Sequence, residues 1–359
     1  MDLAPLRAYT WALLLGLFVP LSWILNLLLG PGVIVFAVAG LAIIPLAWFL
    51  GLATEELGKH AGPGVGGLLN ATFGNATELI IAVFALSRGL TEVVKASLTG
   101  SVVGNLLLVL GLSMLAGGVK YKAQHFSREA SGIQITMLVV AVIGLVMPAL
   151  YVLSTDIRSG LALEEMSLGI AGILLLAYVF GLYFSLRTHR DIFNPVTDVS
   201  EKPRWEKRFA LSVLVASTVL VAVESEILVG SLEVARLSLG LTELFVGVII
   251  VAIVGNAAEH GSAILMAWRN KMELSVAVAT TSTTQVALFV APILVFVSLL
   301  TAKVMTLDFE IFELASLALA TAVVAAVVSD GRSNWYEGAL LVMVYALIAV
   351  AFFFHPPPP

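Results

Sequence analysis

Two long apolar stretches of this chain each carry a glutamate near their middle, within nearly the same short motif. The first motif is Gly74-Asn75-Ala76-Thr77-Glu78, in the apolar run 68–86, and the second is Gly255-Asn256-Ala257-Ala258-Glu259, in the run 244–267. Each run is long enough to cross a bilayer, which takes about 20 helical residues. A carboxylate at that depth costs about 2.5–3.5 kcal/mol on insertion scales, so the fold must be arranged around these two glutamates.

The composition indicates a polytopic helical membrane protein. Of the 359 residues, 60% are hydrophobic and 12% are charged, and the mean hydropathy is +1.03. The apolar runs are continuous, which argues against a β-barrel of alternating pattern. The absence of cysteine excludes thiolate metal sites. A net charge of −5 spread through the loops gives no reason to expect a nucleic acid partner.

Eleven apolar runs are separated by charged residues or by Gly/Pro breaks, and each predicts one transmembrane helix. Their approximate bounds are 9–29, 33–58, 64–87, 91–117, 130–153, 163–186, 209–232, 240–267, 272–300, 310–329 and 335–354. We therefore expect an all-α protein with about eleven transmembrane helices.

The basic residues predict the orientation of the chain in the membrane. With a cytoplasmic N-terminus, 14 of the 19 Lys and Arg residues lie in loops on the inside, as the positive-inside rule requires. The C-terminus is then outside. The loops are short, which favours a prokaryotic plasma membrane over an organelle.

The two glutamate motifs occupy equivalent places in two sets of five helices. An odd number of helices in each set makes the halves insert with opposite orientation, as in transporters built from inverted repeats. The predicted regions are an extra N-terminal helix (1–32), a first repeat (33–186), a cytoplasmic linker (187–208) and a second repeat (209–355). The spacing is also nearly preserved, with 27 residues from Glu78 to Asn105 and 26 from Glu259 to Gln285.

The polar residues around the two glutamates form an oxygen-rich set. Asn75 and Asn256 each lie three residues before a glutamate, on the same helix face. Gly74 and Gly255 come one turn before the glutamates, where a glycine lets a helix bend or open and free backbone carbonyls. Further side-chain oxygens come from Asn105 and Gln285. Such a set suits a hard cation, and Ca²⁺ accepts 6–8 oxygens in irregular geometry.

Two carboxylates at one site also predict a coupling mechanism. Two ionised glutamates neutralise one divalent cation. Without the cation, two like charges would remain in a low-dielectric site, so Glu78 and Glu259 would take up protons. Cation and protons would therefore occupy the site in turn, as an antiporter requires.

Several longer motifs resemble those of a known family, the cation/H⁺ exchanger (CAX) branch of the calcium/cation antiporter superfamily. These motifs are LLNATFGNATELI at 68–80, GSVVGNLLLVLG at 100–111, VGNAAEH at 254–260, QVALFVAP at 285–292 and DGRSNWYEG at 330–338. The resemblance covers roughly residues 40–350. It implies a helical exchanger of eleven spans that moves Ca²⁺ against H⁺.

The resemblance also implies roles for individual residues. Glu78 and Glu259 would bind the cation and the protons, with Asn75, Asn105, Asn256 and Gln285 as supporting oxygens. Sodium-coupled relatives carry a Gly-Thr-Ser motif, whereas this chain has Gly-Asn-Ala in both halves, which favours proton coupling. His260 could relay protons or simply hydrogen-bond a neighbour. Glu226 is a candidate gate residue in the seventh span.

Other functions stay open at this point. A Na⁺/Ca²⁺ exchanger is the first alternative, and a divalent-cation channel is the second. An enzyme is not expected, since the chain has no HExxH motif and no convincing Ser/His pair. We expect no cofactor, with Ca²⁺ as a transported substrate. The expected partners are Ca²⁺, H⁺ and the lipid bilayer, and small residues on the helix surfaces are compatible with a homo-oligomer.

Overall fold

The structure is a computed structural model that describes residues 10–155, 160–193 and 202–356. Within this part of the chain, 11 helical stretches are long and apolar enough to span a membrane. Their bounds are Thr10–Leu29, Val33–Ala61, Val65–Ser87, Thr91–Lys120, Arg128–Thr155, Leu161–Thr188, Lys207–Leu239, Glu243–Trp268, Met272–Ser298, Ile311–Asp330 and Trp335–Phe354. The predicted all-α membrane fold is confirmed. The inverted relation of the two halves stays a prediction.

The predicted boundaries hold to within a few residues for most helices. The largest difference is in the seventh span, which was expected to end at 232 and continues to Leu239. The extra turns carry an ion pair between Arg236 and Glu233, with an N–O distance of 2.6 Å, which a polar helix end accommodates. Parts of three predicted regions, at 1–9, 156–159 and 194–201, lie outside the described residues.

The chain forms two compact units that alternate along the sequence. The described part of the first unit comprises 10–85, 202–242 and 254–258, and that of the second comprises 86–155, 160–193, 243–253 and 259–356. Helix α13 (Ala252–Trp268) contributes residues to both. The predicted division into 33–186 and 209–355 therefore differs from this grouping by packing, and remains a hypothesis about sequence repeats.

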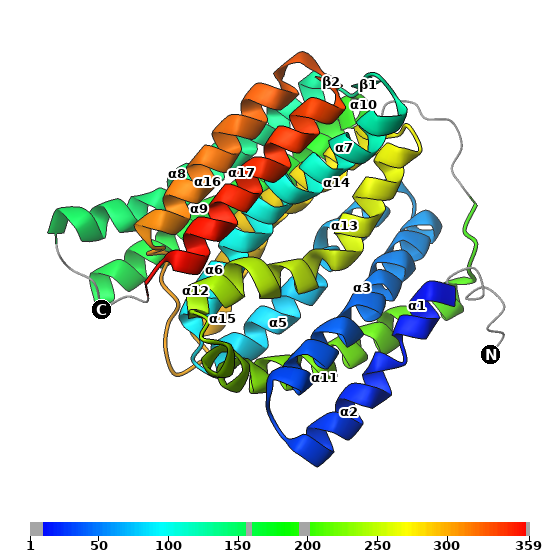
Figure 1. Cartoon of the computed structure of the whole chain (residues 1–359). Helices are drawn as coiled ribbons and strands as arrows, with labels where there is room; N and C mark the ends of the chain where they lie inside the picture. The colour runs from blue at the N-terminus through cyan, green and yellow to red at the C-terminus, as the bar shows by residue number, and fades with distance from the viewer. Residues whose placement is uncertain (1–9, 156–159, 194–201, 357–359) are drawn as a thin grey trace. The chain divides into compact units, whose positions relative to one another are not determined.

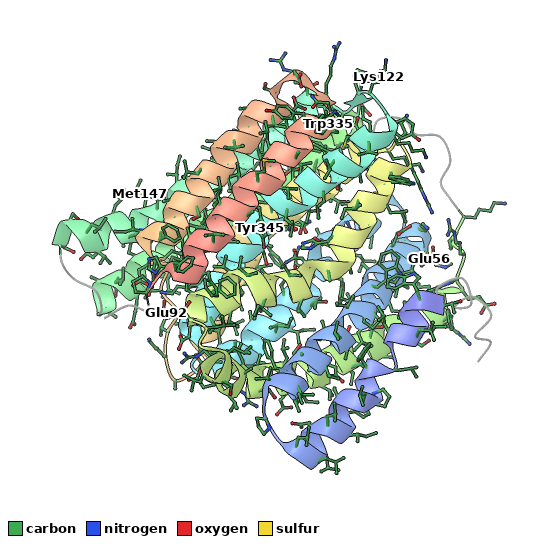
Figure 2. The ribbon with its side chains drawn as sticks, in the orientation of Figure 1. Glu56, Glu92, Lys122, Met147, Trp335 and Tyr345 are labelled. Atoms are coloured by element: carbon green, nitrogen blue, oxygen red, sulfur yellow. The ribbon has the colours of Figure 1, made fainter. Side chains whose placement is uncertain are left out.

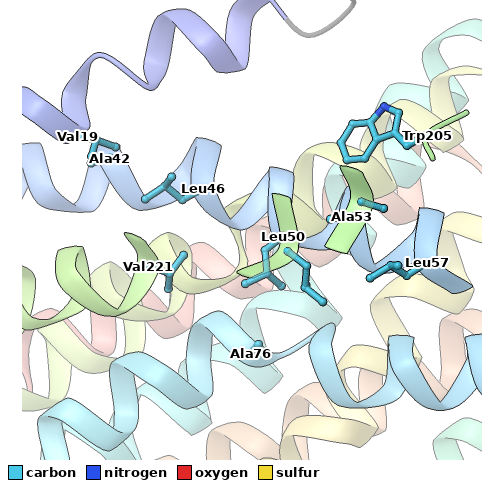
Figure 3. Close-up of a cluster of buried hydrophobic side chains, with 11 residues drawn as sticks. Val19, Ala42, Leu46, Leu50, Ala53, Leu57, Ala76, Trp205 and Val221 are labelled. Carbon is cyan, nitrogen blue, oxygen red and sulfur yellow. The ribbon is translucent and has the colours of Figure 1, made fainter. Parts of the chain in front are cut away.

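The first unit is built mainly from six helices: α1 (Thr10–Leu15), α2 (Phe18–Leu29), α3 (Val33–Ala61), α4 (Pro63–Phe73), α5 (Ala76–Ser87) and α11 (Lys207–Leu239). Helices α3 and α11 lie side by side along most of their length (Figure 1). A cluster of buried apolar side chains joins them, with Leu46 and Leu50 of α3, Val221 of α11 and Ala76 of α5 (Figure 3). Apolar packing thus holds α3, α5 and α11 together.

Polar contacts join the end of α3 to the segment that leads into α11. The Glu56 carboxylate, near the end of α3 (Figure 2), accepts hydrogen bonds from the backbone N–H groups of Arg204 at 2.6 Å and Trp205 at 3.1 Å. His60 Nε2 donates to the Trp205 carbonyl at 2.7 Å. Lys59 Nζ lies 2.8 Å from a Glu56 oxygen and neutralises it. The carboxyl end of α3 and the amino end of α11 are therefore tied together, and the two helices run antiparallel.

The second unit contains the remaining helices and two short strands. They are α6 (Thr91–Val103), α7 (Leu110–Lys120), β1 (Gln124–His125), α8 (Arg128–Thr155), α9 (Leu161–Tyr183), α10 (Arg190–Phe193), α12 (Glu243–Phe245), α14 (Met272–Gln285), α15 (Ala291–Ser298), α16 (Ile311–Val327), β2 (Arg332–Ser333) and α17 (Trp335–Phe354). π-Helical segments lie at Gly104–Val109, Phe184–Thr188, Val246–Val251 and Val286–Val290, and a 3₁₀ turn at Val328–Asp330.

Small residues let two helices of this unit cross at very close range. Helix α6 packs on the segment 246–251, and a Cβ added at Gly100 would overlap the Val248 backbone. Ala96 lies opposite Gly247 at the same crossing. Close backbone approach through small residues is the usual way for membrane helices to associate, since lipid offers no hydrophobic drive between them.

A two-stranded antiparallel pairing ties two loops of the second unit together. β1 pairs with β2, with Gln124 opposite Ser333 and His125 opposite Arg332. The sequence did not indicate these strands, which are only two residues long. The predicted orientation places both loops on the cytoplasmic side of the membrane, and the pairing of β1 with β2 agrees with this placement.

Candidate functional site

The first glutamate lies at the start of a helix and against a glycine of α13. Helix α4 ends at Phe73, α5 begins at Ala76, and Glu78 is in the first turn of α5. A helix N-terminus favours a negative charge. A Cβ built on Gly255 would lie 3.1 Å from Cγ of Glu78. Glu78 therefore packs on the bare backbone of Gly255, within the first unit.

The helix break at the first motif is local. Gly74 keeps helical dihedral angles of φ −54° and ψ −47°, and the Leu79 N–H donates to the Asn75 carbonyl at 3.1 Å. The expectation that Gly74 interrupts its helix is thus met in part, because the regular helix stops on both sides of it. The Asn75 carbonyl, however, remains within the helical hydrogen-bond pattern.

At Gly255 the helix is not opened. Helix α13 runs without interruption from Ala252 to Trp268, so Gly255 does not open its helix. Its role in the fold is to leave space, because a side chain there would press on Glu78. The neighbouring Asn256 is buried, as is Asn75 in the first motif. Glu78, Asn75, Gly255 and Asn256 thus belong to one compact unit.

The second glutamate is joined to Asn105 through a serine. The Ser282 hydroxyl of α14 hydrogen-bonds the Glu259 carboxylate, and Asn105 Nδ2 donates to Ser282 Oγ at 3.1 Å. All three side chains belong to the second unit. The sequence alone does not single out Ser282 among the hydroxyl residues of its helix. The chain of contacts from Asn105 to Glu259 makes it part of the site.

The neighbours of Ser282 show why the serine was missed. Thr280, Thr283 and Thr284 each donate to a carbonyl of their own helix, at 2.7–2.9 Å. Such back-bonding is the usual fate of a hydroxyl inside a helix. Ser282 differs because its hydroxyl meets a side chain of another helix. The run Thr-Ser-Thr-Thr carries the signal for a polar site, but it does not tell which hydroxyl is used.

Two of the four supporting amides, Asn105 and Gln285, lie at π-helical segments. Asn105 is the second residue of the segment Gly104–Val109, and Gln285 directly precedes the segment Val286–Val290. Both side chains are buried. Single π-helical turns inside α-helices are frequently found at functional sites. Their equivalent positions in the fourth and ninth spans agree with the repeat that the sequence predicts.

His260 and Glu226 differ in their surroundings. Among the described residues, no group hydrogen-bonds Nε2 of His260, which is buried. Glu226 is exposed on α11, whereas Glu224 is fully buried. Glu224, and not Glu226, lies on the face of α11 that packs inward.

Within the described part of the chain, no group of three or more His, Asp or Glu side chains could hold a metal ion. The candidate ligands are two glutamates with amide and hydroxyl groups. That donor set suits a hard cation bound by oxygen.

The comparisons with known proteins agree on one family. A family model described as sodium/calcium exchanger protein matches residues 31–187 and 209–354. The Ca(2+)/H(+) antiporter of Synechocystis sp. is 47% identical over 362 residues, which cover 96% of this chain and 97% of the relative. The Ca(2+)/H(+) antiporter ChaA of Bacillus subtilis is 48% identical over 343 residues, with 93% and 96% covered.

A solved structure agrees as well. The structure of native YfkE matches with a TM-score of 0.83 and 44% identity, over 96% of this chain and 99% of that one. The similarity therefore extends over both units of the fold and over both glutamate motifs.

Proposed function

The chain belongs to the sodium/calcium exchanger protein family, and on that premise we propose that it is an integral membrane antiporter that exchanges Ca²⁺ for H⁺. The observation that carries the proposal is the high identity, over nearly the whole chain, to two proteins named Ca(2+)/H(+) antiporter. The Na⁺/Ca²⁺ alternative is not favoured, because these relatives are named for proton exchange. The expectation of a transporter rather than an enzyme follows from the family.

In this proposal Glu78 and Glu259 bind one Ca²⁺ together. Glu78 packs on Gly255, and Glu259 follows four residues later on the same face of the continuous helix α13. Asn75, Asn256, Asn105 and Gln285 supply further oxygens, and Ser282 positions the Glu259 carboxylate. Gly74 and Gly255 contribute backbone atoms, and their lack of a side chain leaves space for neighbouring groups. Ca²⁺ is the transported substrate, and no cofactor is required.

Proton coupling follows from the charge of the two carboxylates. With Ca²⁺ bound, the two negative charges are neutralised. When the cation leaves, two bare carboxylates in a low-dielectric environment are unstable, so each binds a proton. The protonated site has little affinity for Ca²⁺. Exchange results because the site turns from one side of the membrane to the other only when it holds Ca²⁺ or protons.

Alternating access requires that some helices move relative to others. We assign this movement to α3 and α11, which pack along their length and are tied at one end by Glu56, Arg204 and Trp205. A pair joined in this way can shift as one body. His260, beside Glu259, is a candidate proton relay, and Glu226 on α11 stays a candidate for guiding cations to the site.

We propose a prokaryotic plasma membrane as the location, with the N-terminus in the cytoplasm and the C-terminus outside. The distribution of basic residues supports this orientation. Two loops that this orientation places in the cytoplasm are also in contact, through the pairing of β1 with β2. Both glutamates come from one chain, so exchange needs no second copy, and a homo-oligomer remains a prediction.

The test is Ca²⁺ transport by the purified protein in liposomes. Vesicles that are acidic inside are placed in a more alkaline medium with radioactive Ca²⁺, and uptake is followed. We expect uptake driven by the proton gradient, and loss of uptake in Glu78→Gln and Glu259→Gln. The matched control is Glu165→Gln, which changes an exposed glutamate of α9.

Two results would overturn the proposal. The first is uptake that ignores the pH gradient and persists in Glu78→Gln. The second is uptake that needs a Na⁺ gradient and stops when choline replaces Na⁺, which would support the Na⁺/Ca²⁺ alternative. Ion flux that continues at rates far above antiporter turnover would support a channel.

A further inference from the structure

A third carboxylate, Glu224, is buried inside the membrane-spanning part of α11 and is not used by the site above. Its side chain has 0% relative exposure. The Ser22 hydroxyl of α2 donates to Glu224 Oε2 at 2.6 Å, and the Trp23 side chain is a second hydrogen-bond donor. All three residues belong to the first unit.

The surroundings of Glu224 provide no positive charge. Its two partners are a hydroxyl and an indole, both neutral. Among the described residues, no basic group lies within ion-pair distance of it, and no donor reaches Oε1. A permanently ionised carboxylate in this place would carry the full cost of a bare charge in a membrane, about 2.5–3.5 kcal/mol. A proton on Oε1 removes that charge.

The depth of Glu224 matches that of the first half of the candidate site. Leu228 lies one turn further along the same face of α11. A Cβ on Gly40 of α3 would lie 3.6 Å from Leu228 Cδ1 and 3.3 Å from Val254 Cγ2. Val254 directly precedes Gly255, on which Glu78 packs. Glu224 is therefore about one helical turn, roughly 6 Å along the axis, from the level of these contacts.

The titratable groups on the packed elements do not neutralise Glu224. Helices α1 and α2 carry no charged residue, and α3 carries its own (Glu55, Glu56, Lys59 and His60) only in its last two turns. The other groups near this level are Glu78 on α5 and Glu226 on α11, which are also carboxylates. Like charges add to the cost of ionising Glu224.

We propose that Glu224 is a third proton-binding residue, which carries one proton across the membrane with the α3–α11 pair in each transport cycle. The proposal rests on Ca²⁺/H⁺ exchange as the function. The proton binds Oε1 on the side from which H⁺ enters, and the same O–H bond breaks on the other side, where the proton passes to water. The carboxylate then returns without a proton in the half-cycle that carries Ca²⁺. About three H⁺ then move for each Ca²⁺, instead of about two, and each cycle moves one net positive charge.

The experiment measures the ratio of the two ions and the effect of voltage. The protein is placed in liposomes whose membrane potential is set by K⁺ and valinomycin. For a fixed pH gradient, the Ca²⁺ gradient at which net Ca²⁺ flux stops is determined at several voltages. We expect this balance point to depend on voltage in the wild type and in Glu165→Gln, and to lose its voltage dependence in Glu224→Gln.

A second variant separates proton binding from folding. Glu224→Asp keeps a carboxyl group and should keep the voltage dependence, with a changed rate. A wild-type ratio of about two H⁺ per Ca²⁺, with no effect of voltage, would overturn the proposal whatever the variants do, and so would an unchanged ratio in Glu224→Gln. Either result leaves Ca²⁺/H⁺ exchange intact, whereas a wild type without proton-driven Ca²⁺ flux would overturn the function itself.

Discussion

Glu78 of α5 and Gly255 of α13 are in direct contact, although 177 positions separate them in the chain. A Cβ on Gly255 would lie 3.1 Å from Glu78 Cγ and 3.8 Å from Glu78 Cδ. The two residues come from the two copies of the Gly-Asn-Ala motif. The glycine of the second copy therefore makes room for the glutamate of the first.

We predict that Gly255→Ala weakens Ca²⁺ binding without unfolding the protein. A contact of 3.1 Å is too short for two carbon atoms, so Glu78 must move by a few tenths of an ångström. Small displacements of a ligand lower affinity strongly, and we expect the Ca²⁺ concentration for half-maximal transport to rise about tenfold. The measurement is initial Ca²⁺ uptake over a range of Ca²⁺ concentrations.

The control for this variant is Gly261→Ala on the same helix, where an added Cβ meets nothing within 4 Å. It should transport like the wild type. Equal Ca²⁺ affinity in Gly255→Ala and Gly261→Ala would show that Glu78 is not held by this contact.

We predict that Gly100→Ala destabilises the protein. The added Cβ would overlap the Val248 carbonyl group, which is backbone and cannot rotate away. Overpacking of this kind costs about 1–3 kcal/mol or more. Thermal unfolding in detergent should therefore begin several degrees lower, whereas Gly132→Ala, at an open position of α8, should unfold like the wild type. Unchanged unfolding of Gly100→Ala would contradict the close crossing of α6 and residues 246–251.

The eleven spans could be predicted from the sequence because hydrophobic length is a strong signal in a membrane protein. The sequence does not show which face of each helix packs inward and which faces lipid. In a soluble protein the apolar face of α11 would stand out, but here lipid is as apolar as the core. Glu224 and Glu226 lie on either side of Ser225 within one apolar run, so only the structure shows that Glu224 lies inward.

The carboxylates and amides of the candidate site could be named from the sequence, and their role stays a prediction. The repetition of the motif pointed to Glu78 and Glu259, and their spacing pointed to Asn105 and Gln285. The use of Gly255 as open space and the contact of Ser282 with Glu259 were not predictable. A glycine can open a helix or admit a neighbour, and a serine can bond its own helix or another, so only tertiary packing decides between these uses.

We predict that Ser282→Ala lowers the apparent Ca²⁺ affinity about tenfold. Loss of the hydroxyl removes a hydrogen bond to Glu259 and the acceptor for Asn105 Nδ2, and hydrogen bonds to charged groups contribute about 1.5–3 kcal/mol. The matched control is Thr283→Ser, at the next position of the same helix, where the hydroxyl bonds the Ala279 carbonyl. A Ser282→Ala protein with wild-type affinity would exclude the serine from the site.

We predict that protons compete with Ca²⁺ on the side where Ca²⁺ binds. Because both ions use Glu78 and Glu259, a lower pH on that side should raise the Ca²⁺ concentration for half-maximal uptake, while the maximal rate at saturating Ca²⁺ changes little. The measurement is uptake at several external pH values with the gradient held constant. A fall in maximal rate with unchanged half-saturation would argue for separate cation and proton sites.

A buried lysine in the second unit provides a prediction about stability. Lys95 is 4% exposed. Its Nζ lies 2.9 Å from Glu92 Oε2 and 3.4 Å from Asp308 Oδ1, and donates to the Asp308 carbonyl at 3.0 Å. Glu92, labelled in Figure 2, lies in the first turn of α6. The lysine therefore joins α6 to the loop before α16.

We predict that Lys95→Met destabilises the protein by about 1–3 kcal/mol, because it removes the cation shared by Glu92 and Asp308, whose carboxylates remain partly open to solvent. Glu313 adds to the effect, since it is 1% exposed and accepts a hydrogen bond from Thr99 at 3.0 Å in the same region. Thermal unfolding in detergent measures the loss, and Lys303→Met, at an exposed position of the same loop, is the control. If Lys95→Met and Lys303→Met unfold at the same temperature, the ion pairs of Lys95 do not hold the loop.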